Sequence, residues 1–287
     1  MARDYKWPNG ARIAVAVTAM LETWSEGKGP PYGVQASPLK PGITDYAGIA
    51  WGSYGGKVGV YRLIRLFKDN GIRATFAVNG RCAEIYPDAV TAIVASGHDV
   101  AGHGWYQDEL LSYLAPEEER AVIARSLDVL ERASGVRPAG WISPSMAFTP
   151  HTRGFLAERK LLWHGDARDS DLPRLVDSGG PGGLGGEIVH IPGSDFTDNR
   201  VLRSSSMDLW DVYTNTFDYL YHREAPAFMA LTMHCHFGGR PMIAAVMDKV
   251  FKHIAKHPRV WLASFAEIAT WVRDNRLEAD PRRLLGP

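Results

Sequence analysis

The sequence has very little cysteine and no excess of charge of either sign. Cys82 and Cys235 are the only cysteines among 287 residues, and 32 Lys and Arg residues balance 32 Asp and Glu residues. A balanced charge provides neither a basic face for nucleic acid nor an acidic tail, so no nucleic-acid partner is expected. Both cysteines lie in segments that we expect to be buried, which favours reduced thiols over a disulfide framework.

Long hydrophobic runs are also missing. The apolar stretches 13–17 and 228–233 have the length of strands, far below the roughly 20 residues that a membrane-spanning helix requires. Near the N-terminus, charges and a Pro-Asn-Gly turn stand where a secretory signal would place its apolar stretch. We therefore expect a cytoplasmic protein with no membrane segment.

The common cofactor and nucleophile motifs are absent as well. There is no Gly-x-Gly-x-x-Gly after a predicted strand, no phosphate-binding loop, no His-Glu-x-x-His and no Gly-x-Ser-x-Gly. The glycine-rich stretch 178–186 is not followed by a helix and is interpreted as a flexible loop. Dinucleotide, nucleotide and serine-hydrolase functions therefore lose support.

What the sequence does contain is a regular alternation of strand and helix patterns. The expected strands are 12–20, 72–79, 98–103, 141–145, 161–166, 187–191, 228–236 and 260–264, and the expected helices are 60–67, 86–96, 116–134, 149–159, 207–222, 239–256 and a last one from 265. This order predicts a parallel sheet covered by helices, and about seven such units favour closure into a barrel over a doubly wound open sheet. We expect one α/β domain over 1–287, with 272–287 as a C-terminal arm and the Gly- and Pro-rich segment 25–54 as an active-site loop.

Polar residues cluster where these strands end. Glu22 follows the first strand, His103 the third, Asp166 the fifth, and His234 and His236 the strand that begins at 228. The C-terminal ends of barrel strands are where such folds gather their chemistry. These positions therefore predict one active site.

The residue types suggest roles in acid–base or metal chemistry. A buried carboxylate such as Glu22 is costly unless it is employed, as a metal ligand, a general base or an acceptor for a substrate N–H. His103 can be a metal ligand or a substrate hydrogen-bonding group. His234 is expected to give or take a proton, with Asp166 holding its imidazolium, and His236, two residues further along the strand, is expected to face the same pocket.

Other residues are expected to bind the substrate. Arg137 precedes a strand and could fix a carboxylate in bidentate fashion. Aromatic walls shape small-molecule pockets. The candidate substrate-binding residues are Trp24, Trp105, Trp141, Ser143 and His236.

Five segments resemble the polysaccharide deacetylase (NodB-homology) family: 17–22, 97–108, 137–145, 166–173 and 231–241. The phrases Gly-His-Asp-Val-Ala-Gly-His-Gly-Trp and Arg-Pro-Ala-Gly-Trp are most similar to the cytoplasmic branch with peptidoglycan deacetylase-like proteins and an allantoinase. The resemblance implies a single-domain distorted (β/α) barrel of about seven or eight strands. It also implies that Glu22 and His103 match metal ligands, His234 the late histidine acid, Asp166 its orienting carboxylate and Arg137 the arginine that steadies the base.

Two positions depart from the pattern of metal-dependent members. Gln107 stands where the second metal histidine would be, and the usual pair of first-strand acids is reduced to Glu22. Glu22, His103 and Gln107 would make a poor zinc site because an amide oxygen is a weak ligand for a borderline metal. Whether a zinc-type divalent cofactor binds is left open at this stage, and the allantoinase-like branch is thought to work without one.

The resemblance implies a hydrolase of a non-peptide carbon–nitrogen bond, in a linear or cyclic amide, that acts on a small amide or N-acyl substrate. The alternatives are a metal-dependent deacetylase of N-acetyl sugar or peptidoglycan, in carbohydrate metabolism, and a catalytically silent ligand-binding barrel. The family branch also suggests a homo-oligomer.

Overall fold

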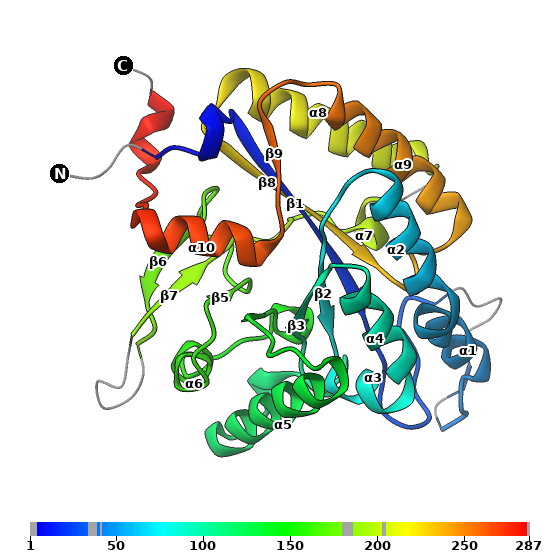
Figure 1. Ribbon diagram of the computed structural model, residues 1–287. Helices are drawn as coiled ribbons and strands as arrows, with labels where there is room; N and C mark the ends of the chain where they lie inside the picture. The colour runs from blue at the N-terminus through cyan, green and yellow to red at the C-terminus, as the bar shows by residue number, and fades with distance from the viewer. Residues whose placement is uncertain (1–4, 34–38, 41, 180–185, 203–204, 286–287) are drawn as a thin grey trace.

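The computed structural model describes all residues except 1–4, 34–38, 41, 180–185, 203–204 and 286–287 (Figure 1). Its strands are β1 Ile13–Leu21, β2 Thr75–Val78, β3 Asp99–Gly102, β4 Gly140–Trp141, β5 Trp163–His164, β6 Arg174–Asp177, β7 Glu187–His190, β8 Ala227–His234 and β9 Val260–Leu262. Its α-helices are α1 Tyr46–Tyr54, α2 Val60–Asp69, α3 Gly80–Ile85, α4 Pro87–Ala95, α5 Pro116–Ser134, α6 Thr152–Glu158, α7 Asp198–Val201, α8 Met207–Arg223, α9 Pro241–Ala255 and α10 Phe265–Asn275.

The strands form one curled sheet with the order β6-β7-β5-β4-β3-β2-β1-β8, and β9 pairs with the start of β1. All strand pairs are parallel except β6 with β7. β8, at one edge of the sheet, makes a further isolated parallel bridge, between Thr232 and Thr197, the residue just before α7. The predicted distorted (β/α) barrel is confirmed. Among the described residues, β6 and β8, at the two ends of the strand order, do not pair with each other, so the barrel is open there.

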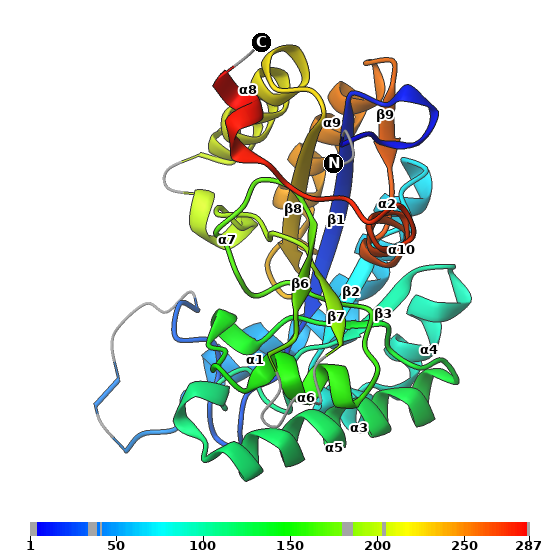
Figure 2. The same cartoon turned by 90° about the vertical axis from the view of Figure 1, so that its left-hand side faces the viewer.

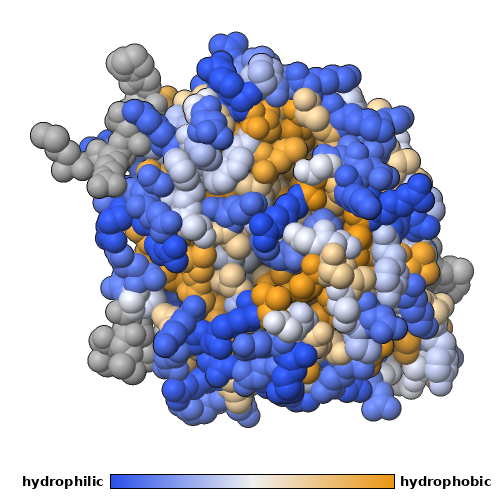
Figure 3. Space-filling view, in the orientation of Figure 1, coloured by the Kyte–Doolittle hydropathy of each residue, from blue (hydrophilic) through white to orange (hydrophobic). Residues whose placement is uncertain are grey.

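Helices cover the outside of this sheet, and both chain ends lie on the same side of the molecule (Figures 1 and 2). Most helices begin near their predicted residues, and α5 has the predicted bounds. Hydrophilic side chains surround a group of apolar ones in the middle of the face shown in Figure 3. None of the described helices is both long and apolar enough to cross a membrane.

β1 lies in the middle of the core, and all nine of its residues are buried. Because strand side chains alternate between two faces, its odd-numbered residues join the cluster that includes helices α2, α8 and α9, and Ala14, Ala16 and Met20 join the cluster on the other face. Thr18, Met20 and Glu22 continue that second face and line a cavity. The period of two therefore directs Glu22 into the barrel.

Three expectations about local structure were wrong. Segment 25–54 is not all loop, because helix α1 lies within it. Asp45 caps this helix by accepting a hydrogen bond from the Gly48 N–H at 2.8 Å. The strand expected at 141–145 ends at Trp141 and gives way to a short 3-10 helix. The edge strand β6 was missed; it pairs antiparallel with β7, and most of the glycine-rich stretch between them lies outside the described residues.

The expected C-terminal arm begins inside the core. Val272 in α10 and Leu277 beyond it are both buried in the hydrophobic cluster that contains Ala14, Ala16 and Met20 of β1, and Ala279 packs against that cluster. An arm that reaches a second copy would therefore have to start after Leu277.

Candidate active site

Glu22 lies at the centre of a group of three histidines. Its Oε1 atom is 3.4 Å from His103 Nε2 and 3.8 Å from His234 Nε2, and its Oε2 atom is 3.7 Å from His236 Nδ1. The carboxylate is almost fully buried where β1 leaves the sheet. The structure thus brings together four residues that the sequence predicted for one site.

His103 is held by the strand next to its own. It follows β3, and its Nδ1–H donates to the carbonyl of Ile142 at 2.7 Å. That bond fixes the ring and leaves Nε2 facing the Glu22 carboxylate. His103 Nε2 and Glu22 Oε1 therefore face each other at one cavity.

His234 is held by Asp198, not by Asp166. Asp198 Oδ1 lies 2.6 Å from His234 Nδ1, and Asp198 Oδ2 accepts the backbone N–H of His234 at 2.8 Å. Both side chains are buried. Asp198 therefore occupies the position beside His234 that the sequence analysis expected for Asp166.

These charges shift the pKa values of the group. Burial opposes ionisation of Glu22, but His234, His103 and His236 outweigh burial and lower its pKa to about 2. Burial likewise opposes charge on His234, yet Asp198 and Glu22 raise its pKa to about 9. At neutral pH the site therefore holds a carboxylate next to an imidazolium whose Nε2–H points toward it.

His236 faces Glu22 from another side, away from the cavity. β8 ends at His234, so the alternation of faces stops before His236, which sits in a turn. Its Nε2 is 3.0 Å from the Tyr32 hydroxyl, and the rings of Trp24 and Trp51 pack against it. Burial lowers the pKa of His236 to about 3, so the ring is neutral. It does not line the cavity, contrary to the expectation of substrate contact.

Asp166 supports Ser143. Its Oδ1 accepts the Ser143 N–H at 2.6 Å, and its Oδ2 accepts the Ser143 hydroxyl at 2.9 Å. Burial raises the pKa of Asp166 to about 6 against the effect of these bonds. Ser143 itself lines the cavity as predicted, so Asp166 positions a cavity residue without facing the cavity.

Four other predicted site residues lie elsewhere. Arg137 is exposed and bonds to Glu131 and to the carbonyl of Arg159, because it precedes β4 and therefore sits at the opposite end of the sheet from the site. Trp105 and Trp141 pack into the hydrophobic core, and Trp24 packs on His236. None of the four lines the cavity; large apolar rings beside strands gain more from core packing than from a wet pocket.

The cavity above Glu22 has a volume of about 100 Å³. Glu22, His103, Gln107, Ser143 and His234 line it together with Thr18, Met20, Tyr32, Ile142, Ser145, Met146, Gly165, Arg168, Gly193, Thr197, Asn199, Arg200, Thr232 and Phe265. Arg168 has one long ion pair, 3.7 Å to Asp195. The cavity thus offers cationic donors opposite an acid–base group.

The donors around Glu22 only partly fit a zinc-type ion. The 3.4 Å between Glu22 Oε1 and His103 Nε2 suits two ligands of one tetrahedral ion, and Gln107 Oε1 is buried without a hydrogen-bond partner. No third His, Cys, Asp or Glu atom of the described chain joins this pair so that all three lie within 4.8 Å of one another. The set is short of the three strong protein ligands typical of catalytic zinc, so the mechanism below uses no metal.

Sequence reasoning missed Asp198, Tyr32 and Arg168. Asp198 lies eight positions after β7 at the start of the four-residue helix α7, too far from the strand end to be recognised by that criterion. Tyr32 and Arg168 sit in loops. A criterion that considers acidic residues throughout the segment after each strand, and not only at the end of the strand, would have included Asp198.

The chain was compared with known proteins. The polysaccharide deacetylase family model matches residues 54–160. A peptidoglycan deacetylase of Helicobacter pylori is 25% identical, over 88% of this chain and 97% of its own. Among solved structures, an allantoinase superposes with a TM-score of 0.83 at 27% identity, covering 95% of this chain and 94% of its own, and a Pseudomonas aeruginosa protein described as a probable polysaccharide deacetylase superposes with a TM-score of 0.81 at 26% identity, covering 95% of both chains.

Proposed function

Because the chain belongs to the polysaccharide deacetylase family, we propose that it hydrolyses a carbon–nitrogen bond in a small linear or cyclic amide. The observation that carries this proposal is the line Asp198–His234–Glu22, in which a carboxylate holds an imidazolium against a second carboxylate inside one cavity. This is the arrangement of a positioned general acid and general base. A pocket that only binds a ligand needs no such pair.

Glu22 and His234 divide the proton transfers between them. Water bound at Glu22 attacks the amide carbon, Glu22 takes a proton from that water, and His234 Nε2 gives its proton to the nitrogen as the C–N bond breaks. A linear amide yields a carboxylic acid and an amine, and a cyclic amide yields one ring-opened molecule that carries both groups. Glu22 Oε1 lies 3.8 Å from His234 Nε2, so the proton gained by Glu22 can replace the one that His234 gives.

The low pKa of Glu22 is compatible with its role as base. The positive charge of His234 is the largest influence that lowers the pKa of Glu22. When His234 gives its proton to the nitrogen, that charge disappears and the pKa of Glu22 rises. The two groups therefore titrate as a coupled pair, and the base strengthens at the moment when the acid is spent.

The cavity supports a small substrate with carbonyl or carboxylate groups. Its volume of about 100 Å³ suits a ring or a short acyl group better than a polymer chain. The guanidinium groups of Arg168 and Arg200 line it and can donate to substrate oxygens. One of the solved structures that the chain resembles is an allantoinase, which is in line with a small cyclic amide as substrate.

The test is hydrolysis of a panel of cyclic ureides, cyclic imides and N-acetyl sugars by the wild type and by the His234→Gln variant. Gln keeps much of the volume of His but cannot act as an acid. We expect turnover of at least one cyclic amide by the wild type and none by the variant. Turnover by His234→Gln at the wild-type rate would refute the acid assignment, and ligand binding without any product would indicate a silent barrel.

A metal-dependent deacetylase is the second candidate function. The Gln107 oxygen, which has no hydrogen-bond partner, favours it because Gln107 lines the same cavity as the Glu22 and His103 pair. Elemental analysis of protein dialysed against a mild chelator distinguishes the two functions. One metal per chain that is lost in His103→Gln, together with release of acetate from N-acetyl sugars, would support the deacetylase.

We also propose that the protein works in the cytoplasm. Cys82 and Cys235 are free and buried, which suits a reducing compartment. A homo-oligomer stays a prediction that sedimentation velocity can check.

A further inference from the structure

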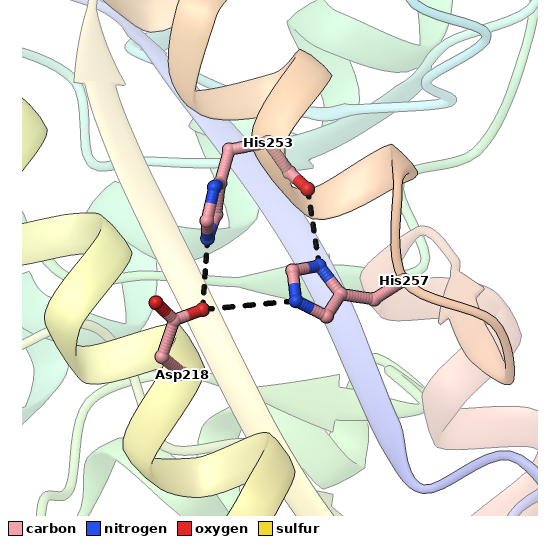
Figure 4. Close-up of side chains that lie close together, drawn as sticks. All are labelled: Asp218, His253 and His257. Atoms are coloured by element: carbon pink, nitrogen blue, oxygen red, sulfur yellow. Dashed lines mark hydrogen bonds and ion pairs between the residues drawn. The ribbon is translucent and has the colours of Figure 1, made fainter.

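A second group of ligand-type side chains lies on the outside of the barrel, where α8 packs against α9. Asp218 on α8 faces His253 on α9 and His257 just after it (Figure 4). Each offers one ligand atom, and these atoms all lie within 4.8 Å of one another. None of the three lines the cavity of the active site.

The distances within this group suit one tetrahedral ion. Asp218 Oδ1 is 2.8 Å from His253 Nε2 and 3.9 Å from His257 Nε2. Bonds of about 2.0 to 2.1 Å from zinc to nitrogen or oxygen place two tetrahedral ligands about 3.3 Å apart. The two observed separations bracket this value, so shifts of about half an ångström would complete the geometry.

The hydrogen bonds determine which nitrogen of His257 faces Asp218. Its Nδ1–H donates to the carbonyl of His253 at 3.1 Å, so Nε2 is the ring nitrogen that faces the Asp218 carboxylate, at 3.9 Å. A carbonyl that holds the second ring nitrogen is typical of histidines that bind metals.

Aromatic rings hold both imidazoles in place. Phe217 and Tyr221 each lie 5.0 Å from the His257 ring, and Trp210 lies 5.6 Å from the His253 ring, measured between centroids. All three aromatics belong to α8, the helix that carries Asp218. The ligands are therefore restrained before any ion binds, which lowers the entropy lost on binding.

We propose that Asp218, His253 and His257 bind a borderline divalent cation such as Zn²⁺, with water as the fourth ligand. The ion would tie α8 to α9. These helices pack on each other next to β8, the strand that ends at His234. The site would therefore stabilise the part of the fold that carries the catalytic acid, and it takes no part in the reaction.

The experiment is calorimetric titration with Zn²⁺, combined with thermal unfolding, in a His103→Gln background. This background removes the imidazole that pairs with Glu22 Oε1 at 3.4 Å. His257→Gln and Asp218→Asn each delete one ligand. The matched control is His151→Gln, which replaces a half-buried histidine just before α6. Unfolding without Zn²⁺ shows whether each variant is folded.

We expect the background protein to bind one Zn²⁺ and to melt at a higher temperature with it. His257→Gln and Asp218→Asn should each weaken binding at least tenfold and lose the increase in melting temperature, and His151→Gln should retain both. No binding in the background protein would overturn the proposal and leave an ordinary surface ion pair. Unchanged affinity in both ligand variants would also overturn it.

Discussion

Replacing Asp198 with Asn tests how the acid is held. Asp198 makes two hydrogen bonds to His234, at 2.6 and 2.8 Å, and helps to raise the pKa of that ring from 6.5 to about 9. At about 1.4 kcal/mol per pKa unit, this difference favours the buried imidazolium by about 3 kcal/mol. Asn removes the charge, and its NH₂ group must face either the backbone N–H or the ring N–H of His234.

We expect Asp198→Asn to lower kcat on the order of 100-fold, because a positioned general acid contributes about that much or more. His234 must be protonated to act, so wild-type activity should fall as pH rises through about 9. In the variant this alkaline limb should move to lower pH. The assay is a pH profile of kcat for the best substrate of the panel.

The matched control is Asp211→Asn, an exposed carboxylate on α8, which should leave both kcat and the alkaline limb unchanged. The same kcat and the same alkaline limb in Asp198→Asn would refute the reasoning. If Asp166→Asn lost most of its kcat and shifted the alkaline limb of the pH profile, and Asp198→Asn changed neither, the orienting role would return to Asp166.

Three further predictions concern other residues. Glu22→Gln should reduce kcat on the order of 100-fold or more, measured under saturating substrate, because the amide cannot accept a proton; full activity would exclude Glu22 as base. Arg137→Ala should stay within roughly twofold of wild-type kcat, since exposed ion pairs contribute little; a larger loss of kcat would place Arg137 in the site after all. Burial raises the pKa of Asp166 from 3.8 to about 6, so the folded protein binds a proton at Asp166 more tightly than the unfolded chain does. This proton stabilises the fold below the pKa of the unfolded state, and the stabilisation is lost as pH rises through about 6. The measurement is denaturant unfolding from pH 4 to pH 7. The free energy of unfolding of the wild type should fall over this range, and that of Asp166→Asn should fall less, by a difference of up to about 3 kcal/mol. Equal decreases in the two proteins would contradict this assignment.

Much of the barrel could be predicted from local patterns. The alternation in β1 extends through Thr18 and Met20 to Glu22, so one period of two fixes both the core faces and the catalytic carboxylate. α5 has its predicted bounds because Pro116 stands at its start and Gly135 adopts a left-handed conformation after its end. These features depend on neighbours in sequence.

The errors arose where contacts distant in sequence decide. Asp198 reaches His234 across 36 positions, through a loop whose path no local pattern specifies. Asp166 follows β5 as expected, but its neighbour in space is Ser143 after β4, because β4 and β5 are adjacent in the sheet and β8 lies at the far edge. Strand order, and not strand identity, was the missing information.

Mass spectrometry of the reaction products, with wild type and His234→Gln side by side, tests the central claim most directly. Hydrolysis of a cyclic amide adds the mass of one water to a single product, and deacetylation of a sugar yields an amine and acetate. The account predicts the ring-opened product from the wild type and none from His234→Gln. Equal amounts of product from both proteins would contradict it.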